Sequence, residues 1–149
     1  MLKYMLIFFV VGCAGMHTGH DELLTNEIRE VEDLIGMYLD YPVVIDNSIH
    51  SYGRCEYYIS IDYFLPVRVL VNKELIEKNN VSLKLVILHE VGHCTFQLGD
   101  VYDHTPRLID GCTSYIMYGR ASTKTHREEC WEKHKKLYLR QMFPRKLTP

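Results

Sequence analysis

Apolar residues recur along residues 21–40 at the spacing of one helix face. Asp21 precedes them as a candidate N-cap, and Tyr41-Pro42 ends the pattern because proline does not continue a helix. The spacing predicts an amphipathic helix that packs on a sheet and keeps its charged face in solvent. The apolar positions are Leu24, Ile28, Val31, Ile35 and Tyr38.

Three β-rich runs follow this helix. The first, Val43–Ile45, is short, and a polar loop at residues 47–54 separates it from the second, Glu56–Asp62. The third, Val67–Asn72, follows Pro66, which marks the start of a strand or an edge position because proline donates no ladder hydrogen bond. We expect a small mixed sheet.

The run at residues 81–99 is apolar nearly all round, which is typical of a helix that crosses a core. A short helical turn at residues 73–78 precedes it. Ser82 is the predicted N-cap, and Gly99 is the predicted end.

The segment of residues 100–124 shows no periodicity and is longer than the loops that usually connect elements inside a compact domain. We therefore expect a functional loop. A capping box, Thr125-x-x-Glu128, then begins a C-terminal helix that ends before Pro144. The elements together predict one α+β domain over residues 21–149.

The first residues combine Lys3 with an apolar run that is too short to span a bilayer as a stable helix. We interpret residues 1–12 as a signal peptide. The sequence Val10-Val11-Gly12-Cys13 resembles the lipobox of bacterial lipoproteins, in which the cysteine becomes lipidated. This implies a lipid on Cys13, a tether at residues 13–20 and a place in the bacterial cell envelope, on the periplasmic side of the outer membrane or at the cell surface. An ordinary secretory signal or a short membrane anchor are the alternatives.

Charge excludes one class of partner. The formal net charge of the 149 residues is −2, so the chain lacks the basic excess of a nucleic-acid-binding protein. Composition gives no signal about oligomeric state.

The apolar helix carries the motif His89-Glu90-Val91-Gly92-His93. Residues four apart lie on the same helix face, so both imidazoles can reach one ion, for which zinc is the expected metal. Glu90 projects about 100° around the helix and can act as a general base without binding the metal. The alternative is a chance match, but buried polar groups without partners are costly.

Catalytic zinc takes three protein ligands and keeps one position for water, so a third ligand is needed. The candidates are Asp100, Asp103 and His104. A continuous helix would carry residue 100 about 16 Å along the axis from His89, so the chain must turn back, which Gly99 would permit.

These residues, with Ser114-Tyr115-Ile116-Met117-Tyr118 further on, resemble the metzincins, zinc peptidases with a Met-turn beneath the metal. The chain is more closely similar, over about residues 83–143, to small zinc-protease-like lipoproteins of bacteria. It departs from the metzincin pattern in its spacing, which is one residue longer between His93 and Asp100, and in having Phe96 at the glycine position. The resemblance implies a metzincin-like fold with His89, His93 and Asp100 as ligands, Glu90 as base and Met117 in the Met-turn.

The expected activity is therefore zinc-dependent hydrolysis of a peptide or protein substrate. Tyr118 or Tyr115 is a candidate oxyanion donor, and an extended peptide is expected to add to the sheet edge at the strand Val67–Val71. A non-catalytic zinc-stabilised envelope lipoprotein and a metal-free binding module are the alternatives. The presence of Glu90 favours the enzyme, because a structural zinc site needs no base.

Four cysteines remain beside Cys13, and an oxidising compartment would let them pair. Four cysteines allow three pairings. We predict Cys112 with Cys130, because Cys112 lies just before the Met-turn segment and Cys130 lies early in the last helix. Cys55 with Cys94 then follows by elimination. Four buried free thiols are the alternative, and a cysteine zinc site lacks the C-x-x-C spacing.

Overall fold

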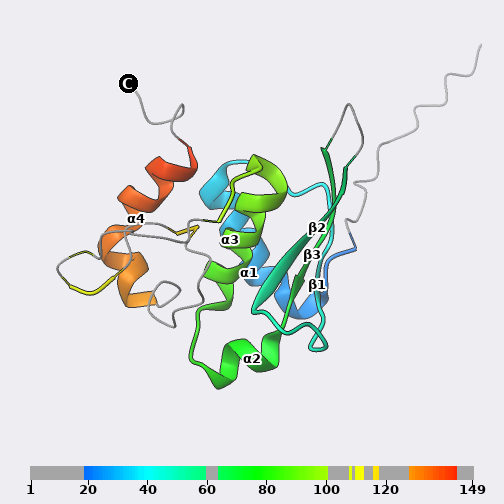
Figure 1. Cartoon of the computed structure of the whole chain (residues 1–149), viewed down its shortest axis with the longest axis horizontal. Helices are drawn as coiled ribbons and strands as arrows, with labels where there is room; N and C mark the ends of the chain where they lie inside the picture. Colours follow the sequence, from blue (N-terminus) through cyan, green and yellow to red (C-terminus); the bar gives the residue numbers. More distant parts are fainter. Residues whose placement is uncertain are drawn as a thin grey trace, which may run out of the picture.

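The computed structural model describes residues 19–59, 64–100, 108, 110–112, 116–117 and 128–143. The described residues form a small α+β domain with a three-stranded mixed sheet and four α-helices, as the sequence predicted at this coarse level (Figure 1). Its elements in chain order are the 3-10 helix η1 Glu22–Leu24, α1 Thr25–Ile35, β1 Val43–Ile45, β2 Gly53–Ile59, β3 Phe64–Val71, α2 Lys73–Lys78, α3 Leu83–Phe96 and α4 Glu128–Met142.

Several predictions concern residues outside these ranges. They are the signal peptide and lipidation at Cys13, the oxyanion donors Tyr115 and Tyr118, and the alternative ligands Asp103 and His104. None of the helices in the described part of the chain has the length and apolar content to cross a membrane.

The first helix is shorter than the sequence pattern suggested. It ends at Ile35, because Gly36 adopts a left-handed conformation with φ 68° and donates its N–H to the Glu32 carbonyl. The prediction that Tyr38 lies on the buried face is therefore wrong. Tyr38 is 87% exposed, and Leu39, at 2%, enters the core in its place.

The strand order of the sheet is β1-β3-β2, so β3 is central. β1 runs parallel to β3 and pairs with it from Val69 to Val71, whereas β2 runs antiparallel to β3 along its length. β1 covers Val69–Val71, so the prediction that the strand Val67–Val71 offers a sheet edge is wrong for these three residues. β2 is an edge strand of the sheet. Pro66 is tolerated because it lies in the half of β3 that β1 does not reach.

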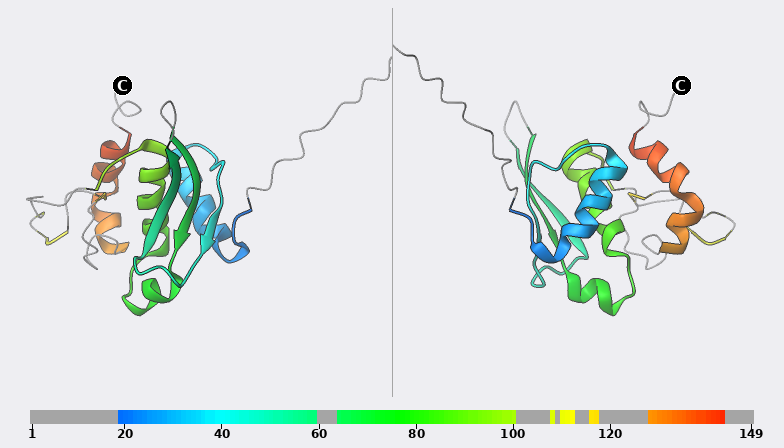
Figure 2. Two further views of the ribbon diagram at one scale, coloured as in Figure 1. Left: turned by 45° about the vertical axis from the view of Figure 1, so that its right-hand side comes forward. Right: turned by 180° about the vertical axis from the view of Figure 1, so that it is seen from behind.

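The helix α3 occupies the centre of the domain, as its apolar composition predicted. It contacts β2 and β3 on one side and also α1 and α4 (Figure 2). Residues 85–92 are all buried. At its start, Ser82 precedes the helix but its hydroxyl donates to Glu128 of α4 at 2.9 Å rather than capping the backbone.

The end of α3 differs from the prediction. The helix stops at Phe96, and Gln97 takes the left-handed conformation with φ 53° that reverses the chain. Gly99 is not left-handed, so its predicted role in ending the helix is wrong. The turn is held by the Leu98 N–H, which donates to the Gly92 carbonyl at 3.1 Å.

Candidate metal centre

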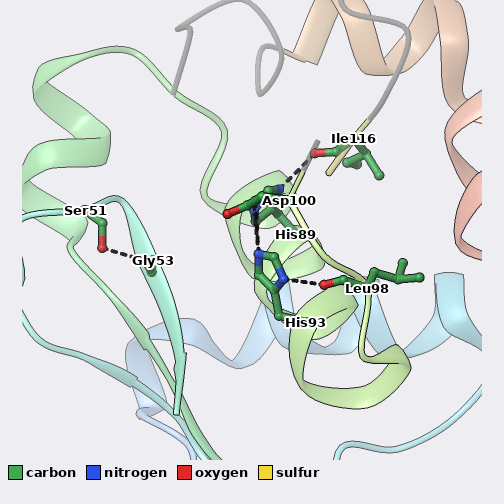
Figure 3. Close-up of polar contacts among 7 residues, drawn as sticks. All are labelled: Ser51, Gly53, His89, His93, Leu98, Asp100 and Ile116. Carbon is green, nitrogen blue, oxygen red and sulfur yellow. Dashed lines mark hydrogen bonds and ion pairs between the residues drawn. The ribbon is translucent and has the colours of Figure 1, made fainter. Parts of the chain in front are cut away.

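Two side chains of α3 and one from the segment after it converge on a single point (Figure 3). The Nε2 atoms of His89 and His93 lie 3.1 Å apart, because four residues make about one helical turn. The Oδ1 atom of Asp100 lies 3.3 Å from each of these nitrogens. The structure thus brings together the three residues that the sequence analysis selected as ligands.

The spacing of these atoms fits a tetrahedral metal ion. Zinc binds histidine nitrogen and carboxylate oxygen at about 2.0–2.2 Å, which places neighbouring ligand atoms roughly 3.3–3.5 Å apart in a tetrahedron. The three observed separations, 3.1, 3.3 and 3.3 Å, are close to the edges of one tetrahedral face. The donor set of two imidazoles and one carboxylate also suits zinc.

Backbone carbonyls orient both imidazoles. The Nδ1 atom of His89 lies 2.9 Å from the carbonyl oxygen of Ile116, and that of His93 lies 2.6 Å from the carbonyl oxygen of Leu98. A carbonyl only accepts, so we assign the ring proton to Nδ1 in each histidine. This tautomer leaves both Nε2 lone pairs directed at the point where Asp100 also lies, which is the usual outer-shell arrangement of metal-binding histidines.

The charges around His89 favour a cation. Burial lowers the pKa of His89, but the hydrogen bond to Asp100 and the charge of Glu90 raise it, and the net result is a pKa above the ordinary value. The negative groups therefore outweigh the cost of burying a positive charge here. A metal ion would satisfy the same groups.

The chain reversal after α3 places Asp100. Gln97 turns the backbone, and Leu98 then uses its N–H to bind Gly92 and its carbonyl to bind His93. The same two-residue turn thus holds one histidine and brings the carboxylate back beside it. A side chain at Gly99 would meet nothing within 4 Å.

Glu90 lies on the side of α3 that faces β2, and it is not one of the converging ligands. It is buried, with 7% of its surface exposed. Burial raises its pKa, while His89, His93 and a backbone hydrogen bond from Cys55 lower it, and the pKa remains above its ordinary value. A carboxylate with a raised pKa is suited to accept and return a proton near neutral pH.

Met117, the predicted Met-turn residue, lies close to Gly92 of α3. It is buried, and its sulfur would be 2.5 Å from a Cβ atom placed on Gly92. The residue before it, Ile116, supplies the carbonyl that orients His89. Ile116 and Met117 therefore lie against α3 at His89 and at Gly92.

Both predicted disulfides are present. Cys55 pairs with Cys94, which joins β2 to α3 next to His93, and Cys112 pairs with Cys130, which joins the segment before Met117 to α4.

A further group, Asp110, Cys112 and His134, also brings possible ligand atoms together. The Cys112 sulfur is held in its disulfide, and Asp110 already bonds His134 at 2.8 Å.

The residues that position the predicted site were not predicted from the sequence. Gly53 and the backbone groups of Cys55, Leu98 and Ile116 carry no motif, and local sequence spacing does not reveal that they meet His89, Glu90 and His93.

Comparisons of the chain with protein-family models, curated proteins and solved structures find no match.

Proposed function

We propose that this protein is a zinc-dependent endopeptidase with a metzincin-like site, anchored in the bacterial envelope by a lipid on Cys13. The observation that carries the proposal is the convergence of His89 Nε2, His93 Nε2 and Asp100 Oδ1 within 3.3 Å of one another. The buried carboxylate of Glu90 next to this group supplies the base that a purely structural site does not need.

His89, His93 and Asp100 would hold the metal. When bound, zinc lowers the pKa of water to about 7 and polarises a carbonyl group. Glu90 takes a proton from the attacking water at its carboxylate and returns it to the nitrogen of the leaving amine. The Ile116 and Leu98 carbonyls keep both imidazoles in the tautomer that frees Nε2 throughout this cycle. Tyr118 stays a prediction as the oxyanion donor.

The edge strand β2 supports a peptide as the substrate. Among the described residues β2 pairs only with β3, so its other side offers backbone groups to an extended chain. The first half of β2 contacts Glu90, and the second half exposes Tyr57, Tyr58 and Ile59. An extended peptide on this edge would pass directly beside the base.

Metal analysis and a cleavage assay on the same preparation test the proposal. We expect one zinc per chain and cleavage of an unfolded protein substrate. Glu90→Gln keeps the shape of the side chain but not its basicity, so it should retain zinc and lose at least about 100-fold in kcat. Zinc without cleavage would favour the non-catalytic zinc lipoprotein, and absence of zinc would favour a metal-free binding module.

A further inference from the structure

Gly53, the first residue of β2, lies against the side chain of Glu90. A Cβ atom placed on Gly53 would be 2.6 Å from Cγ, 3.0 Å from Cδ and 2.8 Å from Oε1 of Glu90. Real Cβ atoms do not approach other atoms this closely. Because Cγ is among the atoms met, rotating only the carboxylate would not relieve the contact.

Glycine is required at position 53 because there is no room for a side chain, and not because of the backbone conformation. Gly53 is a strand residue, and it is not among the glycines with positive φ in the described part of the chain, which are Gly19, Gly36 and Gly111. An alanine could therefore adopt the same backbone without strain. The three nearest atoms that its Cβ would meet belong to the Glu90 side chain.

The start of β2 is fixed in place on several sides. The Ser51 hydroxyl donates to the Gly53 carbonyl at 2.6 Å (Figure 3), and the Asn72 N–H donates to the Tyr52 carbonyl at 2.8 Å. Two residues further on, the Cys55 N–H donates to the Glu90 carboxylate, and the Cys55 side chain is bonded to Cys94 of α3. A larger residue at position 53 would therefore displace Glu90 more easily than it would displace the strand.

We infer that Gly53 is a positioning residue for the base: its missing side chain makes the space in which Glu90 is held against β2 by the Cys55 N–H. The catalytic role of Gly53 rests on the proposed function, whereas its contact with the Glu90 side chain does not. The predicted ligands are His89 and His93 of α3 and Asp100, and the three nearest atoms that a Cβ on Gly53 would meet belong to Glu90. A side chain at position 53 should thus misplace the base and leave the metal bound.

A double-mutant cycle on the metal-free protein tests the contact without an activity assay. Gly53→Ala should lower the midpoint of thermal unfolding by roughly 3–10 °C, as expected for overpacking. In the Glu90→Ala background, which removes the clashing atoms, the same substitution should leave the midpoint unchanged or raise it. Gly99→Ala is the matched control and should change little, because its Cβ meets nothing within 4 Å.

Comparing the effect of Gly53→Ala in the wild-type and in the Glu90→Ala protein shows whether the clash with Glu90 is the cause. Equal losses with and without the Glu90 side chain would overturn the inference, since the alanine would then disturb the strand itself. If Gly53→Ala does not fold, a folded Gly53→Ala/Glu90→Ala protein supports the inference, and an unfolded one overturns it.

An activity assay adds a second readout. Gly53→Ala should retain one zinc per chain and keep KM within about twofold while kcat falls at least tenfold, because misplacing a base affects the chemical step. Unchanged kcat in a zinc-loaded Gly53→Ala protein would also overturn the inference. If the wild-type protein cleaves nothing, the proposed function fails, and the thermal cycle still decides whether Gly53 positions Glu90.

Discussion

The Nδ1 atom of His89 lies 2.9 Å from the carbonyl oxygen of Ile116, a residue 27 positions later in the chain. The orientation of the first predicted ligand therefore depends on the segment that contains Ile116 and Met117. His93 depends instead on Leu98, only five residues away. Disturbing this segment should consequently affect His89 more than His93, and substitutions can test this.

Gly92→Ala should destabilise the protein and weaken zinc binding about tenfold. Its Cβ would lie 2.5 Å from the sulfur of Met117, so the Met117 side chain must shift next to Ile116, whose carbonyl orients His89. Calorimetric titration with zinc measures the affinity. Shortening the opposing side chain in Gly92→Ala/Met117→Ala should recover part of the stability, and a double variant no more stable than Gly92→Ala would show that the clash is not the cause.

Asp100→Ala should weaken zinc binding by at least 100-fold, because it removes one of three convergent ligand atoms. Asp110→Ala, which also removes a carboxylate that bonds a histidine, should leave zinc affinity unchanged. Asp103→Ala and His104→Ala should have smaller effects than Asp100→Ala. Loss of the metal in His104→Ala alone would move the third ligand to that residue.

Removing the Cys55–Cys94 disulfide should cost about 3–4 kcal/mol of unfolding free energy in the chain-entropy model, and removing Cys112–Cys130 slightly less, since the sequence separations are 39 and 18. Paired serine variants and denaturant unfolding measure both losses. Peptide mapping without reduction checks the pairing, which a peptide linking Cys55 to Cys112 would contradict.

Alkaline pH should destabilise the protein through Tyr41. Burial raises its pKa to about 12, and its hydroxyl lies 2.6 Å from that of Thr95. In the unfolded chain the phenol ionises near pH 10. Above this pH, ionisation stabilises the unfolded state relative to the folded state, so the free energy of unfolding falls until about pH 12, by roughly 2–3 kcal/mol in all. Urea unfolding between pH 9 and 12 should show a shallower decline for Tyr41→Phe than for the wild type, and parallel curves would exclude Tyr41 as the cause.

The sequence predicted the parts of the site that depend on local spacing. His89 and His93 follow from the helical repeat, and Asp100 follows from a short reversal after the helix, although the reversal uses Gln97 where Gly99 was expected. The extent of α1 was overestimated because apolar spacing continued to Tyr38, while the left-handed Gly36 ended the helix.

Features that depend on tertiary pairing were not predictable in this way. The strand Val67–Val71 was expected at an edge, but the pairing of β1 on its far side makes β3 central. The contact between Gly53 and Glu90 joins a strand and a helix whose meeting no periodicity encodes. The disulfides were an exception, because a small number of cysteines left few combinations.

The bond between Cys55 and Cys94 closes a covalent ring that contains β3, α2 and the stretch of α3 with His89, Glu90 and His93. A single backbone nick anywhere inside this ring would leave the two fragments tethered. A nicked molecule would migrate as intact on a gel without reductant and as two pieces after reduction. For a protein that we propose to cut peptide bonds, one self-cleavage inside this ring would release neither fragment.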